Sequence, residues 1–115
     1  MKETRLGEFE EVIMLLVGIL GEENSYALKI AEEFKSQTGR GVSIGAVHST
    51  LTRLEDKGFL NSEMGKPTAE RGGRRKRIYK ITAYGKKVLT EARDFKMALW
   101  QQYPAFSFDA LNFGI

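Results

Sequence analysis

A chain of 115 residues with a net charge of +3, of which 42% are hydrophobic and 29% charged, is the size and composition of one soluble domain. The absence of cysteine excludes disulfides, thiolate metal sites and cysteine nucleophiles, and is typical of a cytoplasmic protein. A single histidine and the lack of any phosphate-loop or dinucleotide glycine pattern argue further against an enzyme, a cofactor or a metal site.

A first helix is expected over Glu8–Leu20, with Glu10 and Glu11 as solvated acids in its first turn, where the helix dipole favours them. Residues 12–20 are apolar on almost every side but span only about half of the ~20 residues that cross a membrane. A helix that is apolar all round must be covered all round, and a small domain covers one face. Two interpretations stay open: the outer face packs against a second subunit, or the helix is buried within its own chain.

A second helix is expected from Tyr26 to about Gln37, after a turn over residues 21–24 and with Ser25 as its N-cap. Ser43 is expected to cap a third helix, Ile44–Lys57, which Gly58 ends. One apolar stripe of this third helix is predicted to face the core: Ile44, Val47, Leu51 and Leu54. The opposite face carries small and polar side chains: Gly45, Ala46, Ser49, Thr52 and Arg53, with His48 at the border.

Two segments with strand character, Phe59–Lys66 and Lys76–Ile81, are joined by a stretch rich in turn-forming residues, which predicts a β-hairpin. Its connecting region is strongly basic. Residues 66–80 contain seven cations and one acid, a charge of +6, which leaves −3 for the rest of the chain. A positive excess confined to one hairpin indicates a local anion-binding device.

Thr82 is expected to cap a last helix that runs to about Gln102. Its apolar residues follow the 4-3-4 spacing of helices that pair, which predicts a homodimer. The dimer interface is expected to contain Val12, Leu16, Val88, Ala92, Phe95 and Leu99. An aromatic tail follows Pro104, and we divide the chain into a first domain, residues 1–81, and a dimerisation helix with its tail, residues 82–115.

The predicted fold class is mainly α with a small β-hairpin (α+β), in the order α-α-α-β-β-α, which is that of a winged helix-turn-helix. In this motif the third helix enters the major groove of double-stranded DNA and the hairpin lies along the backbone. Acids at the far end of the third helix should confine contact to its N-terminal half. The expected DNA-binding residues are Ser43, Gly45, Ala46, His48, Ser49, Thr52, Arg53, Arg71, Arg74, Arg75, Lys76 and Arg77.

The segments 43–60 (SIGAVHSTLTRLEDKGFL) and 72–85 (GGRRKRIYKITAYG) resemble the PadR family of transcriptional regulators, and the resemblance covers roughly residues 9–89. It implies a dimeric repressor of the smaller branch, with one short C-terminal helix. His48 stands where family members often have an aromatic residue, and Tyr26 is followed by alanine rather than glycine. Some relatives bind flat aromatic drugs between their last helices, which implies a small aromatic effector near Phe95 and Trp100; the alternative for Trp100 is plain packing in the dimer interface. The alternative is that the same fold binds RNA or protein.

Overall fold

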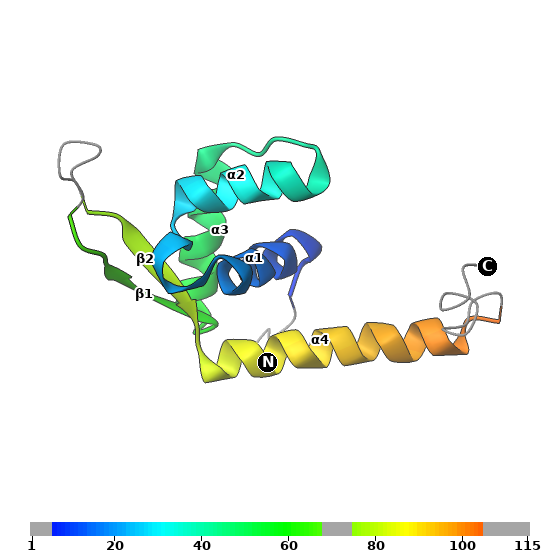
Figure 1. Ribbon diagram of the computed structural model, residues 1–115. Helices are drawn as coiled ribbons and strands as arrows, with labels where there is room; N and C mark the ends of the chain where they lie inside the picture. Colours follow the sequence, from blue (N-terminus) through cyan, green and yellow to red (C-terminus); the bar gives the residue numbers. More distant parts are fainter. Residues whose placement is uncertain (1–5, 68–74, 105–115) are drawn as a thin grey trace.

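The computed structural model describes residues 6–67 and 75–104. Three helices, α1 (Glu8–Asn24), α2 (Ala27–Thr38) and α3 (Ile44–Asp56), precede strands β1 (Leu60–Met64) and β2 (Arg77–Ile81) and the long helix α4 (Ala83–Gln102), as Figure 1 shows. The strands pair antiparallel, with Leu60 opposite Ile81 and Met64 opposite Arg77. The predicted element order is confirmed. Within the part of the chain that is described, no helix has the length and apolar character needed to cross a membrane.

Helix α1 lies at the centre of the domain and packs against α2, α3 and β2. The core contains residues from all the elements: Ile13, Met14, Leu16, Val17, Ala27, Ile30, Phe34, Val47, Leu51, Leu54, Phe59, Leu60, Tyr79 and Val88. The outer face of α1 nevertheless presents Leu15 and Ile19 to solvent, 48% and 63% exposed. Helix α1 is therefore buried within its own chain on one side and exposed on the other, and packing of the exposed side against a second subunit stays a prediction.

Two residues predicted at the dimer interface belong instead to the core of their own chain. Leu16 and Val88 are 3% and 6% exposed, so they are not available to a partner, and Val12 is half-buried against the core. The helical period of the apolar pattern was predicted correctly, but the apolar residues of α1 that face outward are Leu15 and Ile19 rather than Val12 and Leu16.

The junction between α1 and α2 differs from the prediction. Helix α1 continues to Asn24, past a non-helical residue at Gly21, whose φ of 80° lies in the left-handed region that favours glycine. Ser25 is fully buried and does not cap α2, because its hydroxyl donates to the backbone oxygen of Tyr79 at 2.6 Å. The backbone N–H of Tyr79 in turn donates to the backbone carbonyl oxygen of Ser25 at 3.0 Å. Ser25 thus fastens the corner between the two helices to β2.

Helix α3 begins as predicted, since the Ser43 hydroxyl accepts from the backbone N–H of Ala46 at 3.0 Å. Its buried stripe is shifted at one position. Ile44, predicted in the core, is 43% exposed, whereas Thr50 is 3% exposed and lies beside Val47 and Leu51 on the buried side. Ile44 is the first residue of the helix and lies at the edge of the domain, where the core does not reach it.

Helix α4 is anchored at its start and projects at its end (Figure 1). The Thr82 hydroxyl accepts from the backbone N–H of Gly85 at 2.9 Å and donates to the Gly58 carbonyl at 2.7 Å. Gly85 is buried so tightly that a Cβ placed there would lie 2.1 Å from the Phe59 backbone oxygen. The start of the helix therefore packs on the hairpin, its middle lies beside the start of α1, where Lys96 pairs with Glu11, and its C-terminal end extends beyond the domain.

Candidate nucleic-acid interface

The N-terminal half of α3 presents a narrow, polar surface. Gly45, His48, Ser49 and Thr52 are exposed there, and Ala46 is half-buried. A Cβ at Gly45 would have no atom within 4 Å, so the backbone itself is open to an approaching ligand. Small side chains and the uncovered end of the helix together permit close approach of an anionic partner.

The loop end of the hairpin, where the chain enters β2, faces the same space as the start of α3. A hollow of about 340 Å³ lies between the first residues of α2, the first turns of α3 and the entry to β2. Its lining includes Tyr26, Leu28, Ile44, His48, Arg75, Lys76 and Arg77, and no acidic residue. Helix α3 and the hairpin are far apart in the sequence, and the fold brings them to one cationic surface.

The described cations of the hairpin differ in their surroundings. The ammonium of Lys76 lies 4.4 Å from the centre of the Tyr26 ring, a cation–π contact that holds the loop end of the hairpin against the start of α2. Arg77 donates to the Ser62 hydroxyl at 3.1 Å, and Ser62 donates to the Glu55 carboxylate at 2.9 Å. Arg75 is exposed. Arg71 and Arg74, also predicted to bind DNA, lie outside the described residues.

Arg53, predicted as a DNA contact, has its guanidinium bound within the chain. Its Nε donates to Glu10 Oε2 at 2.8 Å and its Nη2 to the Thr50 hydroxyl at 3.3 Å, while the side chain stays half exposed. Lys57, the residue that follows the end of α3, donates to the same carboxylate oxygen at 3.0 Å. The sequence prediction missed this cluster, because it placed Glu10 among the solvated acids.

Glu10 is only 7% exposed and its carboxylate is fully engaged. Burial alone would raise its pKa, but the backbone N–H of Gly7, which donates at 2.8 Å, and the cations Arg53 and Lys57 outweigh this effect. The net result is a pKa lowered from 4.5 to about 2. Glu10 is therefore ionised at neutral pH and places a negative charge between α1 and α3.

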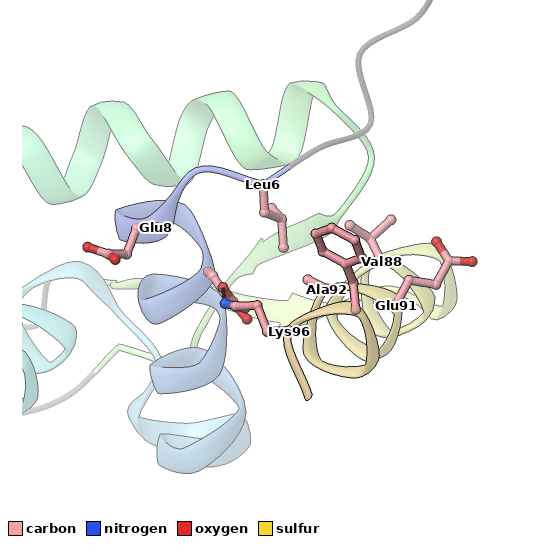
Figure 2. Close-up of a pocket in the computed structure, with 8 residues that line it drawn as sticks. Leu6, Glu8, Val88, Glu91, Ala92 and Lys96 are labelled. Atoms are coloured by element: carbon pink, nitrogen blue, oxygen red, sulfur yellow. Dashed lines mark hydrogen bonds and ion pairs between the residues drawn. The ribbon is translucent and has the colours of Figure 1, made fainter. Parts of the chain in front are cut away.

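A second surface lies between α1 and α4. Figure 2 shows Leu6 directed toward Val88 and Ala92 of α4, with Lys96 reaching toward α1, where it forms an ion pair with Glu11. These residues line a hollow of about 600 Å³ to which Phe95 also contributes. Trp100 lines a different hollow, with Leu15 and Met97. The two predicted effector residues thus lie on different hollows, and Trp100 packs edge-on against Tyr103 with ring centres 6.1 Å apart.

Helix α4 exposes several large apolar side chains in its second half. Phe95 is 66% exposed and Leu99 and Trp100 are each 50% exposed, whereas Ala92 is half-buried. Leu15 and Ile19 on α1 are exposed as well. We call the exposed apolar side chains of the two helices, Leu15, Ile19, Phe95, Leu99 and Trp100, the α1–α4 apolar face; Leu15 and Trp100 line one hollow and Phe95 lines another.

Comparisons with known proteins agree with this architecture. A transcription factor from Bacteroides fragilis described as PadR-like is 26% identical, with a TM-score of 0.68 over 84% of this chain and 87% of that one. A transcriptional regulator from Clostridium thermocellum is 23% identical, with a TM-score of 0.62 over 84% of this chain and 90% of that one. Bacillus subtilis PadR, solved with operator DNA, is 23% identical, with a TM-score of 0.58 over 73% of this chain and 45% of that one.

These structures share the winged-helix fold, which confirms the predicted fold class. No curated protein sequence matches the chain. Residues 16–91, which contain α2, α3, the hairpin and the start of α4, match the family described as Transcriptional regulator PadR-like. The chain therefore belongs to the PadR-like family of transcriptional regulators.

Proposed function

We propose that this regulator binds double-stranded DNA, with the first turns of α3 in the major groove and the hairpin along the backbone. The observation that carries the proposal is the common hollow of α3 and the loop end of the hairpin, which has cations and no acid in its lining. The fold is shared with Bacillus subtilis PadR, which was solved in complex with operator DNA. A transcription factor of this family is not an enzyme. Among the described residues, no three histidine or acidic side chains form a group that could hold a metal ion.

The two elements would have different tasks. Exposed groups on α3 that donate or accept hydrogen bonds, at His48, Ser49 and Thr52, suit the reading of base edges. Gly45 lets the helix lie deep in the groove. The hairpin cations, Arg75 to Arg77 together with Arg71 and Arg74, suit phosphates, which position the protein without reading sequence. Ser43 and Ala46 lie at the helix start, where the dipole attracts a phosphate.

We also propose that two chains associate through the α1–α4 apolar face, so that residues 1–81 bind DNA and residues 82–115 dimerise. Exposed apolar side chains on a projecting helix are costly in water and favour a second copy. The 4-3-4 spacing of α4 is typical of paired helices. A symmetric dimer would recognise a near-palindromic operator. Repression, and its relief by a small aromatic effector near Phe95 and Trp100, complete this proposal.

Binding to duplex DNA at several salt concentrations tests the proposed function. We expect the logarithm of the binding constant to fall steeply with the logarithm of salt concentration, by about 0.9 per phosphate contacted. Arg75→Ala should weaken binding to all duplexes alike and make this dependence shallower by about one contact. Lys87→Ala removes an equal, exposed charge from α4 and serves as the control. Weak binding to duplex DNA, flat salt dependence, or a preference for RNA would contradict the proposal.

A further inference from the structure

Two cations lie next to the proposed DNA-reading face of α3: Arg53 is in the last turn of the helix, and Lys57 is the residue that follows its end. Ser49 and Arg53 are four residues apart, so they lie one above the other on the helix surface. Arg53 is half exposed, and Lys57 retains about a quarter of its side-chain exposure. Two cations beside a DNA-binding face would normally be attracted to the phosphate backbone.

In this chain both cations are already bound by one carboxylate. Glu10 accepts from Arg53 at 2.8 Å and from Lys57 at 3.0 Å, and its other oxygen accepts from the backbone N–H of Gly7 at 2.8 Å. Thr50 accepts from a second guanidinium nitrogen of Arg53. A buried carboxylate that is held from three sides presents its charge in a fixed position, as a phosphate group would.

We propose that Glu10 substitutes internally for a DNA phosphate and withholds Arg53 and Lys57 from the duplex. This inference rests on the proposed function. Phosphate contacts strengthen binding to every sequence, whereas specificity is the ratio between operator and random DNA. A carboxylate that occupies two cations therefore lowers non-specific affinity and leaves discrimination to the first turns of α3.

The chain offers a matched control for this idea. Glu11 is the next residue of the same helical turn, but its ion-pair partner is Lys96 on α4 rather than a cation on α3. Glu10→Gln and Glu11→Gln change the net charge equally, so any general electrostatic effect on DNA binding is common to both. A difference between them reports the release of Arg53 and Lys57.

The test measures binding of each variant to a short duplex of random sequence over a range of salt concentrations. For Glu10→Gln we expect tighter binding at low salt than for Glu11→Gln. We also expect a dependence on salt that is steeper by about 0.9 for each cation released, up to two. Adding Arg53→Gln to Glu10→Gln should remove about one of these contacts. The ratio of binding to duplexes enriched from a random library over binding to random duplexes should be smaller for Glu10→Gln than for the wild-type protein.

Equal binding by the two glutamate variants would overturn the proposal. Arg53→Gln alone gives an independent decision if Glu10→Gln does not fold, as judged by circular dichroism. We expect this variant to keep the salt dependence of the wild-type protein, because Arg53 does not contact phosphate, and a dependence shallower by about 0.9 would overturn the inference. Failure of the wild-type protein to bind duplex DNA would instead refute the proposed function.

Discussion

Two adjacent glutamates in the first turn of α1 illustrate how much a single residue position decides. Glu10 faces inward and binds Arg53 and Lys57 of α3, whereas Glu11 pairs with Lys96 of α4. Neighbouring residues of a helix point about 100° apart, so the two carboxylates reach different elements. The start of α1 is thereby linked by charge to both α3 and α4.

Acid titration should reveal the contribution of Glu10 to stability. Its pKa is lowered in the folded protein, so its stabilisation is complete above about pH 4.5 and is lost as the pH falls toward 2. We expect the free energy of unfolding of the wild-type protein to fall more steeply in this range than that of Glu10→Gln. Between pH 4.5 and pH 2, the wild-type protein should lose at most about 3 kcal/mol more of its free energy of unfolding than Glu10→Gln loses, since each pKa unit corresponds to about 1.4 kcal/mol.

Chemical denaturation at a series of pH values measures this difference. Glu91→Gln removes one carboxylate from the exposed surface of α4 and controls for the loss of a charge. Parallel acid profiles for the wild-type protein and Glu10→Gln would show that the cluster contributes nothing to folding.

At the scale of elements, the junction between the hairpin and α4 determines where the long helix points. Thr82 caps α4 and also bonds to the backbone at Gly58 and Phe59, and Gly85 permits the helix to touch the Phe59 carbonyl. The direction of α4 therefore depends on backbone contacts in its first turn. Val88 adds a buried side chain one turn later.

Gly85→Ala should destabilise the protein even though alanine favours helices. Its Cβ would lie 2.1 Å from a backbone oxygen, so the start of α4 must shift, at a cost of about 1–3 kcal/mol typical of overpacked sites. Gly45→Ala is the matched control: its Cβ meets no atom within 4 Å, and we expect a gain of up to about 1 kcal/mol. Urea denaturation compares the two, and equal stabilities would contradict the packing described here.

At the scale of the whole molecule, the domain and the distal part of α4 differ in how far their apolar side chains are buried. The domain buries most of its apolar residues, while Phe95, Leu99 and Trp100 in the distal part of α4 are exposed. Figure 1 shows this end of the helix projecting past the domain. Among the described residues, Phe95, Leu99 and Trp100 stay half or more exposed, and Trp100 packs edge-on against Tyr103. A second copy is the cover that we propose.

The dimer can be tested by placing a charge on this surface. We expect the wild-type protein to sediment at twice the chain mass of 13.0 kDa, and Leu99→Asp to shift it toward the single-chain mass, because a buried unpaired carboxylate is costly. Gln101→Asp adds the same charge at an exposed polar position of the same helix. A wild-type protein of single-chain mass at micromolar concentration would refute the dimer, and equal effects of the two variants would place its interface elsewhere.

The order of the elements, the Ser43 and Thr82 caps, the basic hairpin and most of the apolar stripes could be predicted from the sequence. These features depend on periodicity, capping and turn chemistry, which act over a few residues. The role of Ser25, the exposure of Ile44, the burial of Leu16 and Val88 and the binding of Arg53 by Glu10 could not. Each depends on contacts with residues distant in the chain, and in the sequence Glu10 and Glu11 are chemically identical. Only tertiary packing, which brings α1 against α3, decided which of them is buried and which cations it binds.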